Sequence, residues 1–271
     1  MKPGEPLITL TTDFGARDSY VAQMKGVMLG INPRARFIDV THDIPPQSIL
    51  RAALMLPEVV DTFPEGTFHL IVVDPGVGST REILAAEIAG HHFIAPDNGL
   101  LDPLCQIHTP QRQFKLTPGP YWRGNISSTF HGRDIMAPAI AHWSRGVALE
   151  ELGESLERPP RTLFLPTPEI TENEIRGTIL YADHFGNLVS NIRREDLAAD
   201  DDELLIRLES EGRLKFSANG IQHTYAAVAL GEGLALWGSH GYLEVGVNGG
   251  SAAQAFDVKS GATLIVEISK S

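Results

Sequence analysis

The stretch that decides the fold runs Phe68-His69-Leu70-Ile71-Val72-Val73-Asp74-Pro75-Gly76-Val77-Gly78-Ser79-Thr80-Arg81. Its largely apolar first part predicts a buried strand, and the Pro-Gly pair after Asp74 predicts a sharp turn. In an open α/β sheet, ligands bind beyond the carboxyl ends of the strands. We therefore expect a functional site at the end of this strand, where Asp74 and Arg81 bring opposite charges to one turn.

Short strands and amphipathic helices alternate before this stretch. The first strand ends at Asp13, a carboxylate in the same kind of position as Asp74. The helix that follows is expected to have Asp18 as its N-cap and to stop at Pro33. This alternation predicts an α/β domain whose mostly parallel sheet is flanked by helices. The predicted strands cover residues 7–12, 36–40 and 67–73, and the predicted helices cover 18–31 and 46–60.

Proline is concentrated between residues 159 and 168, where it fills four of ten positions. Such a stretch favours an extended linker, so we expect an N-terminal domain over 1–165 and a C-terminal domain over 166–271. The second domain is predicted to be smaller, all-β and barrel-like. Its strands are expected at 175–181, 203–208, 234–237, 242–247 and 263–268, and the acidic run 198–203 is interpreted as a solvated turn.

Charge and hydropathy argue against several classes of partner. The 271 residues carry a formal net charge of −12 without a compensating basic block, which disfavours binding to a phosphate backbone. A signal-peptide core is missing at the N-terminus, as is any apolar run long enough to span a bilayer. A single cysteine, Cys105, excludes an intrachain disulfide. We expect a cytoplasmic protein that binds neither nucleic acid nor membranes.

The motifs leave more than one chemistry open. Neither a dinucleotide fingerprint nor a P-loop occurs. Acids and histidines at turn positions are compatible with a divalent cation and hence with a metal-dependent phosphohydrolase. Arg81 and Arg133 lie close to these acids in the sequence, and a carboxylate beside arginine is more typical of an ion pair than of a metal ligand. The turn positions are Asp13, Asp39, His42, Asp43, Asp74, Asp97, His131 and Asp134.

An Asp/Arg/His group can also position and polarise a water molecule, although a structural ion-pair network explains the same residues. In the second domain, polar turns at 183–192, 238–241 and 247–252 offer backbone groups to a flat or polar ligand. Ordinary hairpin turns are the alternative interpretation there.

Taken together, the motifs resemble those of the SAM hydroxide adenosyltransferase family, the adenosine-forming hydrolases of S-adenosyl-L-methionine (SAM) that are related to the SAM-dependent fluorinase and chlorinase. The resemblance extends from residue 11 to about residue 252. Seven segments match in the family's order: Thr11-Thr12-Asp13-Phe14-Gly15, Asp39-Val40-Thr41-His42-Asp43-Ile44-Pro45-Pro46, Val73-Asp74-Pro75-Gly76-Val77-Gly78-Ser79, Ala95-Pro96-Asp97-Asn98-Gly99-Leu100, Phe130-His131-Gly132-Arg133-Asp134, Asp183-His184-Phe185-Gly186-Asn187 and Gly238-Ser239-His240-Gly241.

The resemblance implies hydrolysis of SAM to adenosine and L-methionine by attack of water at the ribose 5′-carbon. In the family's hydroxide-using branch, the catalytic set corresponds to Asp74, Arg81 and His131. The halogenases replace the acid and the histidine and insert a loop after the turn. This chain keeps the three residues and continues directly into Glu82, so halide use is not expected.

The same resemblance assigns the remaining contacts. SAM is implied to be the substrate, with no cofactor and no metal, in a homotrimer that binds it between domains of neighbouring subunits. A non-catalytic protein that binds adenosine or SAM remains a further alternative. The implied substrate contacts are Asp13 at the ribose, Asp183 and Ser239 at the methionine end, Asn187 and the backbone of Val247 and Gly249 at the adenine, and His240 where the fluorinase has an arginine at the carboxylate.

Overall fold

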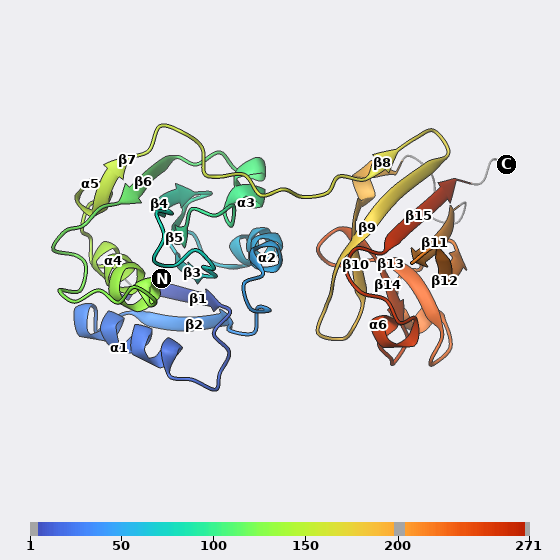
Figure 1. Ribbon diagram of the computed structural model, residues 1–271, viewed down its shortest axis with the longest axis horizontal. Coiled ribbons are helices and arrows are strands. Elements are labelled where there is room, and N and C mark those ends of the chain that lie inside the picture. The colour runs from blue at the N-terminus through green and yellow to red at the C-terminus, as the bar shows by residue number, and fades with distance from the viewer. Residues whose placement is uncertain (1–4, 198–203, 269–271) are drawn as a thin grey trace. The chain divides into compact units, whose positions relative to one another are not determined.

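A computed structural model describes residues 5–197 and 204–268. The chain divides into two compact units, Met1–Phe164 and Leu165–Ser271, and each is considered separately (Figure 1). The acidic run 198–203, which includes the first residue of one predicted strand, lies outside the described residues. None of the helices within the described ranges combines the length and the apolar character that a membrane span requires.

The N-terminal unit contains a seven-stranded mixed sheet in the order β2-β1-β3-β5-β4-β6-β7. The four strands from β2 to β5 in that order are parallel, whereas β4, β6 and β7 are antiparallel to their neighbours. The expected class, an α/β sheet flanked by helices, is confirmed. The strands are β1 (Leu7–Thr12), β2 (Arg36–Thr41), β3 (Phe68–Val72), β4 (Ile83–Ile88), β5 (His91–Pro96), β6 (Arg112–Leu116) and β7 (Gly153–Ser155).

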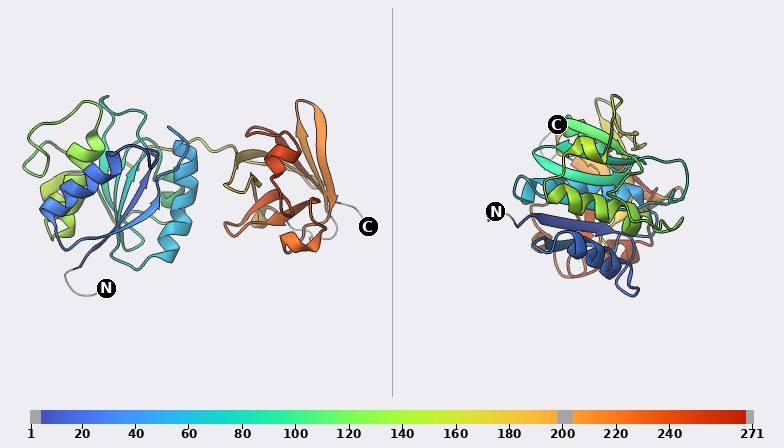
Figure 2. Two further views of the ribbon diagram at one scale, coloured as in Figure 1. Left: turned by 90° about the horizontal axis from the view of Figure 1, so that it is seen from below. Right: turned by 90° about the vertical axis from the view of Figure 1, so that its left-hand side faces the viewer.

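Helices cover both faces of this sheet (Figure 2). On one face α1 and α4 pack against β1 and β3, for example through Met28 and Leu70. On the other face α2 and α3 pack against β3 and β4, for example through Leu56 and Ile71. The helical segments of this unit are α1 (Tyr20–Ile31), α2 (Ile49–Thr62), α3 (Asp102–Ile107), the π-helix η1 (Gly132–Met136), α4 (Ala137–Ser144) and α5 (Leu149–Leu152).

The connections around β1 create a switch in strand order. The crossover through α1 leads from β1 to β2 on one side, and the crossover through α2 leads from β2 to β3 on the other side of β1. Ligands in doubly wound sheets bind beyond the carboxyl ends of the strands at such a switch. Asp13 follows β1 and Asp74 closely follows β3, so the two strand-end carboxylates lie at this edge.

Two helices begin later than predicted. The N-cap of α1 is Ser19 instead of Asp18. Helix α2 begins at Ile49, not at residue 46, because Gln47 has a φ of 65°, which no right-handed helix contains. Ser48 is the N-cap, and its hydroxyl accepts a hydrogen bond from the backbone of Arg51.

The C-terminal unit is an antiparallel, nearly closed sheet in the order β12-β11-β15-β9-β10-β14-β13, with β8 beside β9. The two end strands approach each other, since a Cβ added to Gly233 of β13 would lie 2.7 Å from the ring of Phe216 in β12. The barrel-like prediction is confirmed. The elements are β8 (Glu169–Ile170), β9 (Glu174–Ala182), β10 (Leu188–Arg193), η2 (Arg194–Asp196), β11 (Leu204–Ser210), β12 (Arg213–Asn219), η4 (Tyr225–Ala227), β13 (Gly233–Trp237), β14 (Tyr242–Val247), α6 (Ala252–Ala255) and β15 (Thr263–Ile268).

Strand β10 was not predicted, because its polar residues look like part of a turn. Ser190 and Asn191 are buried, yet the side chains of both form hydrogen bonds. The hydroxyl of Ser190 donates to the carbonyl of Leu243, and the side chain of Asn191 accepts from the backbone of Thr178 and donates to the carbonyl of Pro166. Satisfied hydrogen bonds therefore allow polar residues inside this sheet.

Candidate active site

Three side chains near the carboxyl end of β3 form one hydrogen-bonded chain. Arg81 Nε lies 2.9 Å from both carboxylate oxygens of Asp74, and its Nη2 also donates to Asp74 Oδ2. The same Nη2 lies 2.9 Å from Nδ1 of His131. The side chains of Arg81 and Asp74 are only 8% and 5% exposed. The guanidinium thus joins an acid and a histidine in a site that is largely shielded from water.

Two glycines allow the segments that carry these side chains to meet. Gly78 has a φ of 78°, and a Cβ there would lie 2.5 Å from the carbonyl oxygen of Ser128. Gly132, directly after His131, would place a Cβ 3.0 Å from Val72 in β3. Contacts this close to the backbone carbonyl of Ser128 and to the side chain of Val72 form only where a Cβ is absent. The turn between Asp74 and Arg81 therefore packs on the segment that precedes His131.

The hydrogen bonds determine the tautomer of His131. A guanidinium can only donate, so Nδ1 of His131 accepts and the proton of the neutral ring is on Nε2. Burial lowers the pKa of His131, and the positive charge of Arg81 lowers it further. His131 is consequently a neutral ring with an Nε2–H donor that is not used by the Asp74–Arg81 pair.

Asp13 lies at the same sheet edge, after β1. Its Oδ2 accepts a hydrogen bond of 2.7 Å from the backbone N–H of Gln47, the residue with the left-handed φ before α2. The preceding Thr12 is held by Nδ1 of His42 at 2.9 Å, and His42 Nε2 lies 3.1 Å from Asp39. Asp13 thus sits on a well-braced strand end with its carboxylate oriented by the start of α2.

The acids and histidines proposed for a metal site do not gather. Among residues 5–197 and 204–268, no group of three or more His, Cys, Asp or Glu side chains is arranged to hold a metal ion. Asp39 pairs with Lys25, and Asp134 pairs with Arg123 and Arg133. Although burial alone would raise it, hydrogen bonds from Arg133, Ser127 and Arg123 lower the pKa of Asp134 to about 2. These carboxylates serve ion pairs.

Two further carboxylates fasten the segment that leaves the N-terminal unit. Asp97, at the end of β5, binds the guanidinium of Arg158 at 2.5 Å and the backbone N–H of Arg161 at 2.8 Å. Asp102 accepts from the backbone N–H of Leu163 at 2.9 Å. Part of the proline-rich stretch is therefore anchored to the sheet and is not a free linker.

A second polar chain lies on the outer face of the C-terminal sheet. Asp183 accepts from both the backbone and the side-chain amide of Asn187, at 2.8 and 2.9 Å. The amide of Asn187 also donates to the hydroxyl of Tyr225 at 3.0 Å, and this hydroxyl donates to Glu244. The other oxygen of Glu244 lies 3.3 Å from Nε2 of His240. Three expected site residues are thus joined through Tyr225 and Glu244, which sequence reasoning missed.

The remaining expected site residues, Ser239, Val247 and Gly249, lie close to this hydrogen-bonded cluster in the sequence. Ser239 is exposed on the turn between β13 and β14 and precedes His240. Val247 ends β14 and is 6% exposed, while Gly249 has a φ of 70° in the following turn. One signal in the sequence could have pointed to Glu244. Glycines at positions 238 and 246 lie on either side of it in the fold, and each leaves room for an aromatic or imidazole ring to cover the carboxylate.

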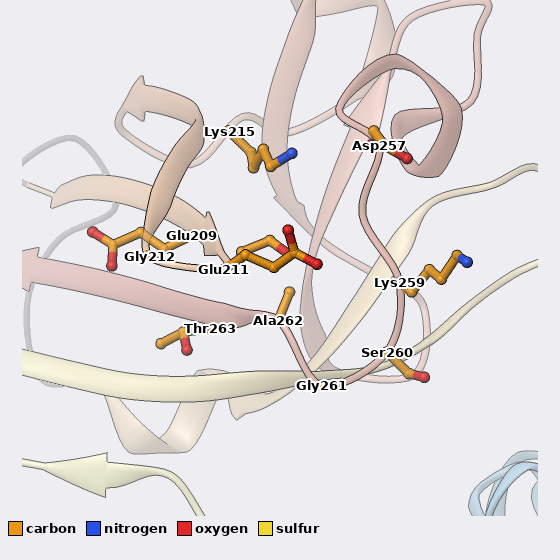
Figure 3. A pocket seen from close by; sticks show the side chains of 11 residues that line it. Glu209, Glu211, Gly212, Lys215, Asp257, Lys259, Ser260, Gly261, Ala262 and Thr263 are labelled. Atoms are coloured by element: carbon orange, nitrogen blue, oxygen red, sulfur yellow. The ribbon is translucent and has the colours of Figure 1, made fainter.

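A groove of about 630 Å³ lies elsewhere on the C-terminal unit (Figure 3). Acidic and basic side chains both project from its walls, so its lining favours no single ligand charge. None of the expected site residues is part of it. The lining residues are Glu209, Ser210, Glu211, Gly212, Lys215, Asp257, Lys259, Ser260, Gly261, Ala262 and Thr263.

Comparison with known proteins identifies the family. Residues 8–153 match the SAM hydroxide adenosyltransferase N-terminal domain, and residues 177–265 match the C-terminal domain of the same family. The chain belongs to the SAM hydroxide adenosyltransferase family. This confirms the resemblance seen in the motifs.

Relatives match along the whole chain. An (R)-S-adenosyl-L-methionine hydrolase from Salinispora tropica is 37% identical over 96% of this chain and 97% of its own length. A fluorinase from Actinoplanes sp. is 28% identical over 97% of this chain and 98% of its own length. An uncharacterized conserved protein from Thermotoga maritima has a solved structure with a TM-score of 0.87 and 32% identity, covering 96% of this chain and 99% of that one. The expected enzyme family is therefore confirmed, while the roles of individual residues stay predictions.

Proposed function

We propose that this protein hydrolyses SAM to adenosine and L-methionine by attack of water or hydroxide on the ribose 5′-carbon. The hydrogen-bonded chain of Asp74, Arg81 and His131 is the observation that carries the proposal. The full-length match to the hydrolase from Salinispora tropica supports the choice of substrate. That relative is named for the (R) configuration at the sulfonium of SAM, so both epimers of SAM are candidate substrates of this protein.

The reaction needs help with the nucleophile and not with the leaving group. As the C5′–S bond breaks, its electron pair stays on sulfur and neutralises the sulfonium, so methionine leaves as a thioether without a general acid. The new C5′–O bond forms to a water that loses a proton or to hydroxide. A site with one polar cluster and no second acid therefore suffices.

The three side chains have separate tasks in this proposal. Asp74 orients the guanidinium, and the positive charge of Arg81 favours hydroxide over water nearby. His131 donates its Nε2–H to the attacking oxygen and holds it in line with the C5′–S bond. The ring is not the base that takes the proton, because Nδ1 is occupied by Arg81 and Nε2 is already protonated. The proton of water passes to solvent.

Other contacts of the substrate are proposed from the expected residues. Asp13 binds the ribose hydroxyls, and Asp183 with Ser239 binds the methionine end, where His240 lies beside Ser239. Asn187 and the backbone of Val247 and Gly249 bind the adenine. As the resemblance to the family implies, we propose a homotrimer in which neighbouring subunits complete each site. Native mass spectrometry should then give three chains per particle.

The deciding experiment is incubation with each SAM epimer in oxygen-18 water, followed by chromatography and mass spectrometry. We expect methionine and adenosine that carries the label in its 5′-hydroxyl. Unlabelled adenosine would exclude water as the nucleophile. Turnover that EDTA abolishes would support the metal-dependent alternative, and tight binding of SAM without products would support the non-catalytic one.

A further inference from the structure

Glu244 is a buried carboxylate on a sheet face where charges are usually exposed. Its strand neighbours Leu243 and Val245 point into the core of the C-terminal unit. Since side chains alternate along a strand, Glu244 projects to the opposite face, yet the residue is only 4% exposed. A buried charge needs partners, because desolvation is costly. Here the hydroxyl of Tyr225 and the ring of His240 provide them.

Glycines make this burial possible. A Cβ at Gly246, the next residue on the same face, would lie 2.8 Å from the ring of Tyr225. A Cβ at Gly238 would lie 2.4 Å from the ring of His240 and 2.8 Å from Glu244. Both rings can therefore approach the sheet closely and shield the carboxylate.

The two carboxylates, Glu244 and Asp183, determine the direction of the hydrogen bonds in this cluster. Glu244 has no proton to give, so the Tyr225 hydroxyl donates to it and has only a lone pair left for Asn187. Asp183 on the other side is also an acceptor. The group of Asn187 that faces both must be its NH₂, and both amide protons are used. Burial, together with the hydrogen bond and charge of Glu244, raises the pKa of Tyr225, which keeps this hydroxyl protonated.

The opposite end of the amide is left without a partner. Asn187 is 5% exposed, and its Oδ1 makes no hydrogen bond to any residue of the described part of the chain. The backbone of Gly246 packs closely beside this oxygen, since a Cβ there would lie 3.1 Å from it. This oxygen is not fully buried, so the N–H of a ligand can reach it and supply the missing donor.

We infer that Tyr225 and Glu244 are positioning residues that lock the Asn187 amide with its oxygen toward the ligand, so that the site selects a 6-aminopurine and rejects a 6-oxopurine. The inference rests on the proposed function for the nucleoside itself. An exocyclic amino group donates to Asn187 Oδ1, whereas the 6-oxo group of hypoxanthine would oppose it with a second acceptor. The fixed direction of the Asn187 amide, and not an added charge, produces the selectivity.

The test is calorimetric binding of adenosine and inosine to the full-length protein, without turnover. We expect the wild type to prefer adenosine roughly tenfold to hundredfold, the range for a lost hydrogen bond that leaves a buried acceptor unpaired. In Tyr225→Phe the preference should fall by about a factor of ten, because the amide loses one of its two anchors. Tyr242→Phe is the matched control, since that hydroxyl lies on the same face but contacts Arg193. Its preference should be unchanged.

A second variant keeps the inference testable if Tyr225→Phe does not fold. Glu244→Gln can present either oxygen or nitrogen to Tyr225, so the direction of the hydroxyl is no longer fixed and an intermediate preference is expected. A wild type that binds both nucleosides equally, or neither, overturns the inference, as does a folded Tyr225→Phe with the full preference. Failure of SAM hydrolysis alone, with this pattern intact, would contradict only the proposed function.

Discussion

The two polar clusters of this molecule are built on different principles. In the N-terminal unit, a buried arginine stands between Asp74 and His131, and the group ends in a donor, the Nε2–H of His131. In the C-terminal unit, neutral Tyr225 and Asn187 stand between the carboxylates of Glu244 and Asp183. That group ends in an acceptor, the Oδ1 of Asn187.

The difference matches the tasks proposed for the two units. A fixed positive charge lowers the cost of an oxygen nucleophile, and this effect grows when water is excluded. Recognition of a neutral ring gains little from charge but depends on the direction of each donor and acceptor. Substitutions in the first cluster should therefore lower the rate constant, and those in the second should alter binding and selectivity.

The largest effect is expected at Arg81. Arg81→Met removes the charge next to the nucleophile, and kcat for SAM hydrolysis should fall about 10³-fold. Arg81→Lys should recover only a small part, because an ammonium cannot reproduce the fork that joins Asp74 to His131. Steady-state kinetics provide the measurement, and Arg112→Met, in a surface ion pair with Glu150, is the control. An unchanged kcat in folded Arg81→Met would contradict the proposed role of Asp74, Arg81 and His131 in positioning the attacking water.

A smaller loss is expected at His131. His131→Gln can still donate a hydrogen bond but not from a rigid ring held by Arg81, so kcat should fall about 10²-fold with little change in KM. A rise in KM at constant kcat would instead assign His131 to substrate binding. Thermal unfolding of both proteins shows whether the variant remains folded.

The pH profile tests the neutral state of His131. Its pKa is lowered from 6.5, first by burial and then by Arg81, so the neutral ring persists below pH 6.5. Protonation at lower pH would place a second cation against Arg81 and remove the acceptor at Nδ1. Activity should therefore fall on the acid side with a midpoint below 6.5. The free energy of unfolding should change in the same direction. It decreases as the pH falls, because the unfolded chain binds this proton more readily than the folded chain. An acid limb that persists unchanged in His131→Gln would belong to another group.

The smallest of these effects is expected in the C-terminal cluster. Gly246→Ala places a methyl group against Tyr225 and Asn187, which should raise KM for SAM roughly tenfold through displacement of the amide while kcat changes little. Gly26→Ala is the control, because a Cβ there meets nothing within 4 Å. If kcat falls as much as for His131→Gln, the two clusters do not divide the work as proposed.

Much of the fold follows from local patterns, and the exceptions have clear causes. The strand that ends before Asp74 was predicted because its apolar run and its turn are contiguous in sequence. Strand β10 was missed because the partners of Ser190 and Asn191 come from distant strands. Asp97 was one of several acids with an open role, and its cations lie more than fifty residues further along the chain.

By itself, the sequence determined the alternation of strands and helices, the strand-end carboxylates and the motif order that identifies the family. Each of these depends on neighbours within a few residues or on a conserved order of segments. Only the tertiary structure decided that Arg81 joins Asp74 to His131, and that Glu244 is buried beneath two rings. Burial and hydrogen-bond direction depend on which side chains from distant segments cover a position, and no local pattern contains that information.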